Sequence, residues 1–125
     1  MSEFGGDHAQ ISAEFLHRSQ VYLSDGELLQ ASEKGWGAAV HAVKLYAAAR
    51  QLPYDSHSDF HDIATELRIE TRNEQIRLWE RSANESHSNF YNDNREAPQI
   101  AAYLDDVTNL INLIRHQINL PPVDD

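Results

Sequence analysis

The spacing of the apolar residues is the feature that most constrains the fold of this chain. Along its 125 residues, apolar side chains recur every three or four positions and rarely alternate strictly. That period places them on one face of a helix, whereas a half-buried strand needs a period of two. Only five Gly and four Pro interrupt the pattern. The sequence therefore predicts an all-α protein that forms a single domain over residues 1–125, with a core at about 11–118 and tails at 1–10 and 119–125.

Five helices follow from this spacing together with the residues that typically begin and end helices. The first begins with Ser12 as N-cap and ends at Ser24, before Asp25-Gly26. The second extends from Glu27 to about Arg50 and stops before Leu52-Pro53. We expect the others to be a short helix capped by Ser58 whose apolar residues include Leu67, one over about Glu74–Phe90 and one from Pro98 to about Ile118. A break or bend at 71–73, a polar loop over Tyr91–Arg95 and a frayed C-terminal tail complete the prediction.

The second helix carries an unusual stripe of small residues. At about 100° per residue, one face collects Leu28, Ala31, Gly35, Ala38, Ala39, Ala42, Tyr46 and Ala49. Gly35 and Gly37 each cost about 1 kcal/mol relative to Ala inside a helix. We therefore expect another helix to approach this backbone closely, with Trp36 and Val43 filling the space beside the stripe.

The last helix has the widest apolar face. Its apolar residues follow spacings of four and three, as in a coiled coil, at Ile100, Leu104, Val107, Ile111, Ile114 and Ile118. Leu110 and Leu113 widen this face to about half of the circumference, more than one neighbouring helix normally covers. The sequence therefore predicts a homodimer that uses part of this helix or of the fourth one.

Charge and composition exclude several classes of function. Ten Lys and Arg against 20 Asp and Glu give a net charge of −10, which argues against non-specific binding of duplex DNA. The chain has no Cys, which excludes disulfides, a cysteine nucleophile and thiolate metal sites. The first ten residues contain no basic region followed by an apolar run. We expect a cytoplasmic protein without a membrane span.

The strongest candidate for chemistry is the segment from Arg81 to His87 on the fourth helix. Six positions separate the two side chains by about 120°, with Asn84 between them. A neutral His can accept a proton from an RNA 2′-hydroxyl, and an Arg can stabilise the charge that develops on the phosphate. Arg81, Asn84 and His87 are thus candidate catalytic residues of a metal-independent ribonuclease. The alternative is that His87 is a packed structural histidine.

A second group of candidate residues lies on the second helix. Lys34 and His41 are seven positions apart, on nearly one line, and Trp36 and Lys44 lie close by. These four residues could bind a phosphate or a nucleotide. The alternative is a solvated face whose lysine stems cover apolar surface.

Two further patterns have simpler explanations. His57 and His61 have the spacing of metal ligands on a helix, but no third ligand completes a known site, so we expect neither a metal nor a cofactor. Arginines at 68, 72, 77, 81 and 95 alternate with glutamates at 66, 70, 74, 80 and 85. Ion pairs within helices are the default interpretation, and a basic strip for RNA requires the glutamates to face elsewhere.

Two stretches of the sequence resemble a known family. One is SQVYLSDGELLQASEKGWGAAVHAVK over residues 19–44, and the other is SHSNFY over residues 86–91. They look like the motifs of the PaREP branch of the HEPN superfamily, and the similarity extends over about 13–118. A Trp between two glycines inside a helix makes the first motif fairly specific.

The resemblance implies an up-and-down bundle of four to five helices, commonly paired as a homodimer. HEPN proteins with an Arg-x(4–6)-His motif are often ribonucleases of toxin or defence systems, or partners of minimal nucleotidyltransferases. Arg81 and His87 match that motif, although Ser82 stands where the catalytic form usually has a more polar residue. We expect a non-catalytic module that binds a nucleotide or a protein partner, with the metal-independent endoribonuclease as the alternative.

Overall fold

The computed structural model describes residues 3–56, 58–92 and 95–123, and in these segments it contains five helices and no strand. The helices are α1 (Glu3–Ser24), α2 (Leu28–Ala49), α3 (Ser58–Thr71), α4 (Gln75–Asn92) and α5 (Ala97–Gln117). The all-α prediction is confirmed. The bounds of α2, α4 and α5 lie within two residues of those expected. None of the described helices is long and apolar enough to cross a membrane.

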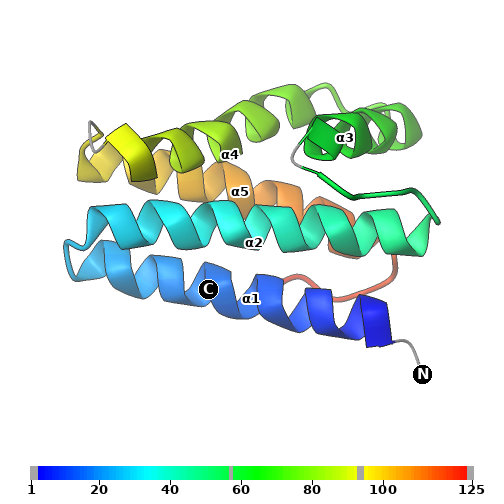
Figure 1. Ribbon diagram of the computed structural model, residues 1–125, viewed down its shortest axis with the longest axis horizontal. Coiled ribbons are helices and arrows are strands. Elements are labelled where there is room, and N and C mark those ends of the chain that lie inside the picture. The colour runs from blue at the N-terminus through cyan, green and yellow to red at the C-terminus, as the bar shows by residue number, and fades with distance from the viewer. Residues whose placement is uncertain (1–2, 57, 93–94, 124–125) are drawn as a thin grey trace.

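Helices α1, α2, α4 and α5 run along the long axis of the molecule, and α3 lies at the end where α2 finishes (Figure 1). Helix α2 packs against each of the other four helices, so it forms the centre of the bundle. Its two glycines, Gly35 on the small stripe and Gly37 on another face, help to explain how it can do so. A Cβ atom added at Gly35 would collide with Leu104 of α5, and one added at Gly37 would lie 2.8 Å from the Phe15 ring of α1. A neighbouring helix therefore packs directly on the α2 backbone at each glycine, as expected.

Local chemistry ends three of the helices in the same way. Gly26, Gln51 and Asn119 each have a positive φ, of 79°, 58° and 65°, and each stands two positions after the last residue of its helix. The next residue donates its N–H to a carbonyl five residues back, as Leu52 does to Ala47 at 2.8 Å. At the start of α5, Glu96 and Gln99 form a reciprocal capping box.

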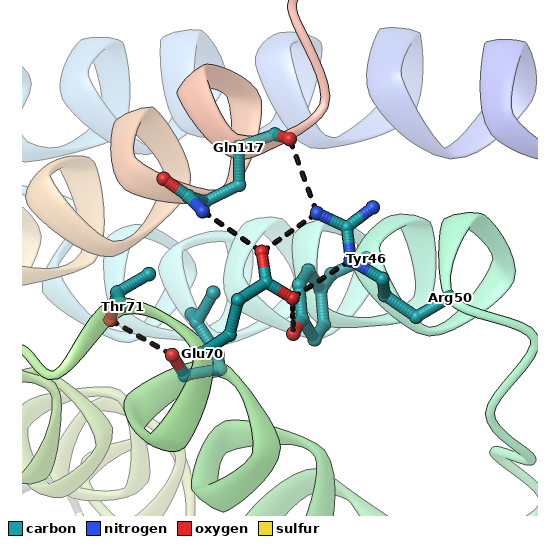
Figure 2. A network of polar contacts seen from close by, with 6 residues as sticks. Tyr46, Arg50, Glu70, Thr71 and Gln117 are labelled. Atoms are coloured by element: carbon teal, nitrogen blue, oxygen red, sulfur yellow. Dashed lines mark hydrogen bonds and ion pairs between the residues drawn. The ribbon is translucent and has the colours of Figure 1, made fainter.

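Figure 2 shows one carboxylate joining the C-terminal ends of α2, α3 and α5. Glu70 accepts hydrogen bonds from Tyr46 (2.6 Å), from two nitrogens of Arg50 (2.8 and 2.7 Å) and from the Gln117 amide (2.8 Å). These bonds lower the pKa of Glu70 to about 2, with that from Arg50 the largest cause. Arg50 also donates to the Gln117 carbonyl at 3.2 Å. The C-terminal ends of helices disfavour negative charge, and the ion pair with Arg50 offsets the charge of the Glu70 carboxylate there.

Two expectations at the chain ends are wrong, and most of the apolar face of α5 is covered within the chain. Ser12 is no N-cap, because α1 begins at Glu3, inside the predicted tail, and the buried Ser12 hydroxyl donates to Ala38 O of α2 at 2.8 Å. The C-terminal segment packs on the core through Leu120 and Val123, and the Val123 N–H bonds Asn112 Oδ1 at 2.8 Å. The wide apolar face of α5 is used inside the chain, since its buried residues include Leu110 as well as the predicted seam from Ile100 to Ile114.

One smaller difference concerns α4. Tyr91 and Asn92, expected in a polar loop, form the last positions of α4. The expected break between α3 and α4 is confirmed, with Arg72 at a φ of 55°.

Candidate functional site

An open groove of about 480 Å³ lies between α3 and α4. We call it the arginine groove. Its lining is polar and combines three cations with one carboxylate and one imidazole, and it consists of His61, Thr65, Arg68, Arg77, Glu80, Arg81 and Asn84. Two of the predicted catalytic residues, Arg81 and Asn84, are thus brought together with side chains that the motif did not include.

The turn between α3 and α4 places these residues opposite one another. Arg77 and Arg81 are four positions apart on α4, and therefore lie one turn apart on the same face. Arg68 faces them from the last turn of α3. The groove thus depends on a tertiary contact between two helices and not on a motif within one of them.

The ion pairs around the groove leave it net positive. Glu74, at the turn, lies 3.4 Å from Arg68 and 3.3 Å from Arg77. Glu80 Oε2 lies 2.6 Å from Nδ1 of His61. Arg81 is exposed and forms no ion pair with any residue that the structure describes. A guanidinium without a carboxylate partner can bind an external anion in two-pronged fashion.

His87 lies apart from this groove. Its imidazole stacks on the indole of Trp36, with ring centroids 4.7 Å apart and 28° between the planes. Trp36 also contacts Phe60 of α3, with ring centroids 4.9 Å apart. The side chain of His87 is half-buried and is not among those that line the groove. The structure therefore brings Arg81 and Asn84 together, and places His87 in an aromatic cluster between α2, α3 and α4.

The serines of the predicted motif face the interior. Ser82 is 6% exposed and donates to Asp106 Oδ2 of α5 at 2.6 Å. Ser86 is completely buried, and its hydroxyl has no hydrogen-bond partner among the described residues. Ser82, which follows Arg81 directly, thus makes a contact between α4 and α5, and its side chain does not line the groove.

The second predicted group divides between two sides of α2. Trp36 and Lys44 line a groove next to the connector that follows α2, together with Val40, Tyr54, Asp55 and Ser56. Lys34 and His41 face α1 instead. The Lys34 Nζ lies 4.3 Å from the centre of the Phe15 ring, and His41 meets the same ring edge-on at 5.6 Å. The four residues therefore do not form one site.

His41 pairs with a histidine of α1 that the sequence analysis did not select. The Nδ1 atoms of His8 and His41 lie 3.0 Å apart, a hydrogen bond that requires one ring to donate and the other to accept. Burial lowers the pKa of both rings, and the charges of Lys44 and of the neighbouring ring lower that of His41 further. The pair is thus favoured in its neutral form.

The described residues contain no group of three or more His, Asp or Glu that could hold a metal ion. His61 bonds Glu80, and His57, the other half of the suspected metal spacing, lies outside the described residues. The interleaved glutamates make fewer contacts within helices than expected. Arg77–Glu74 joins residues three apart, whereas Arg95–Glu85 (2.8 Å) joins residues from different segments.

Comparison with known proteins identifies a family. No curated protein and no solved structure matches the chain. The model of the archaeal PaREP1/PaREP8 family matches residues 7–111, which include α2, the arginine groove and His87. Because this match spans well over half of the chain, the protein belongs to the archaeal PaREP1/PaREP8 family.

Proposed function

We propose that this protein is a small binding module with a HEPN-like helical bundle, and that its arginine groove holds the phosphate groups of a nucleotide. The observation that carries the proposal is the gathering of Arg68, Arg77 and Arg81 in one groove. The chain has only ten Lys and Arg and a net charge of −10. Three cations in one groove of such a chain are a local exception that suits a polyanionic ligand.

The chemistry of the lining supports a phosphate ligand in particular. Guanidinium groups match phosphate oxygens in pairs, and Arg81 has no competing carboxylate among the described residues. The Asn84 amide donates to Glu80 O at 3.0 Å, which leaves its second N–H for a ligand. Glu74 draws Arg68 and Arg77 toward the turn, so Arg81 is the first residue to test.

The position of His87 favours binding without catalysis. A general base must lie within hydrogen-bond reach of the proton that it removes. The His87 ring instead stacks on Trp36, outside the lining of the arginine groove. We therefore place His87 in a structural role and retain Arg81 and Asn84 as ligand-binding residues.

Binding of labelled ATP, followed by fluorescence anisotropy in the presence of EDTA, tests the proposal. We expect Arg81→Ala to weaken binding by about tenfold, the value of one charge-assisted hydrogen bond. Arg18→Ala is the matched control, because Arg18 pairs with Glu14 on the exposed surface of α1. Binding should also weaken as salt increases. Equal affinities of wild type and Arg81→Ala, or no binding, would contradict the proposal.

The endoribonuclease remains the alternative, favoured by one observation. Arg81 is exposed and His87 lies six positions away, so a symmetric dimer could bring Arg81 of one copy to His87 of the other. Incubation with RNA in EDTA, beside His87→Ala and Arg81→Ala, separates the two functions. Cleavage by the wild type that both substitutions abolish would establish the ribonuclease, and equal cleavage or none in all three would exclude it.

We retain two partners as proposals from the resemblance to HEPN proteins. One is a second copy of the chain, and the other is a protein of the nucleotidyltransferase type. Because the apolar face of α5 is buried within the chain, a dimer would have to use another surface. Sedimentation of the purified protein tests the first proposal, and co-expression with a nucleotidyltransferase encoded by a neighbouring gene tests the second.

A further inference from the structure

The groove between α2 and the connector after it holds an unusual combination of groups. We call it the connector groove. It has a volume of about 310 Å³ and is lined by Trp36, Val40, Lys44, Tyr54, Asp55 and Ser56. Two aromatic rings and a valine form apolar walls, while one ammonium, one carboxylate and one hydroxyl provide polar contacts. Its volume lies at the lower end of the range for ligand pockets, so it fits a small molecule.

The two charged groups of the connector groove do not neutralise each other. Lys44 and Asp55 both line it, but neither forms an ion pair with a described residue. The Lys44 Nζ lies 5.4 Å from the centre of the Tyr54 ring, so an aromatic face holds the ammonium. A cation and an anion that share a groove without pairing are complementary to a ligand that carries both charges.

The aromatic residues of the groove are held in place. Trp36 is fixed by Phe60 at 4.9 Å and by His87 at 4.7 Å. Burial and the nearby Asp59 raise the pKa of Tyr54 to about 12, so its hydroxyl stays protonated and able to donate. The Asp59 carboxylate in turn accepts the N–H groups of Asp55 (2.7 Å) and Ser56 (3.1 Å), which fixes the connector. The walls are thus formed before a ligand arrives, which lowers the entropic cost of binding.

We propose that the connector groove binds a free aromatic amino acid. The aromatic side chain would lie between Trp36, Val40 and Tyr54, the carboxylate would pair with Lys44, and the ammonium would pair with Asp55. This ligand uses both charges and the apolar walls. A phosphate dianion fits less well, because Asp55 would repel it, and in this respect the connector groove differs from the arginine groove. The inference does not depend on the function proposed for the arginine groove.

Three small ligands test the proposal on the folded protein. We would titrate L-phenylalanine, phenethylamine and 3-phenylpropionate into ¹⁵N-labelled protein and follow the amide signals by NMR. Phenethylamine lacks the carboxylate and 3-phenylpropionate lacks the ammonium. We expect shifts at Trp36, Lys44 and residues 54–56, and affinity about tenfold lower for each truncated ligand.

Substitutions then assign each charge to its partner. Lys44→Met should make phenylalanine bind no better than phenethylamine, and Asp55→Asn should make it bind no better than 3-phenylpropionate. Lys34→Met and Asp62→Asn are matched controls that leave the groove intact, since neither residue lines it. Each comparison is between ligands on one folded protein, so a loss of stability cannot imitate the result.

Three outcomes would overturn the inference. The first is the absence of shifts with phenylalanine, and the second is equal affinity for the three ligands. The third is tighter binding of adenosine monophosphate than of phenylalanine at these residues, which would make the groove a nucleotide site. Loss of ATP binding in Arg81→Ala, with phenylalanine binding unchanged, would show that the two grooves act separately.

Discussion

The imidazole of His87 stacks on the indole of Trp36, 4.7 Å between centroids, and so joins α4 to α2. This contact gives the histidine of the Arg-x5-His motif a structural task. Aromatic pairs add about 0.5–1.5 kcal/mol beyond the area that they bury. We predict that His87→Ala lowers the free energy of unfolding by about 1 kcal/mol or more, measured by urea denaturation. The exposed His116 of α5 provides the control, and equal losses for His87→Ala and His116→Ala would contradict the prediction.

Gly35 is required where α2 meets α5. A Cβ at this position would collide with the Leu104 side chain. We predict that Gly35→Ala lowers stability by about 1–3 kcal/mol, the usual effect of overpacking, and that Gly35→Leu costs more. The double variant Gly35→Ala/Leu104→Ala should lose less than the sum of the two single variants, because the smaller side chain removes the collision. Additive losses by thermal denaturation would show that no such contact exists.

Two serines on α4 should respond in opposite ways to removal of the hydroxyl. Ser82 donates to Asp106 at 2.6 Å, and its loss should cost about 1.5–3 kcal/mol. The buried Ser86 hydroxyl has no partner among the described residues, so Ser86→Ala should leave stability unchanged or raise it. The two variants differ by one turn of the same helix, which makes each the control of the other. A larger loss in Ser86→Ala than in Ser82→Ala, by urea denaturation, would refute the assignment.

The Glu70 junction predicts how stability depends on pH. The pKa of Glu70 is lowered from 4.5 to about 2, so the unfolded chain binds this proton more tightly than the folded chain does. Its contribution is therefore complete above pH 4.5 and is lost as the pH falls toward 2. Glu70→Gln should be less stable than wild type at pH 7, and the difference should shrink in that window. Glu66→Gln, a change on the exposed surface of α3, should show no such trend. A difference that stays constant with pH would contradict the prediction.

The sequence predicted those parts of the fold that depend on local chemistry. The C-terminal end of α2 and the start of α5 follow from Pro53 and Pro98, whose effects are confined to neighbouring residues. The start of α1 was missed for a different reason. Ser12 is a good N-cap by type, but its hydroxyl bonds Ala38 O of α2, 26 positions away. Such a tertiary contact leaves no trace in the local pattern.

The candidate site was predicted less completely than the fold. The sequence grouped Arg81, Asn84 and His87 as one candidate site, whereas only Arg81 and Asn84 line the arginine groove. The arginine groove also needs Arg68 and His61 of α3, and only the packing of α3 against α4 brings them to Arg81. The cluster of arginines in the sequence was the available signal. That signal could not distinguish a basic strip from ion pairs within helices, because the positions of the glutamates depend on the same packing of α3 against α4.

The central position of α2 has a consequence for how the protein unfolds. Every other described helix packs against α2, so the complete core of the bundle cannot form without this helix. Local opening of the chain ends leaves this helix covered, whereas exposure of its amides requires the bundle to come apart. The backbone amides along Ala38–Ala47 should therefore exchange with solvent only through global unfolding, and the chain should behave as one cooperative unit.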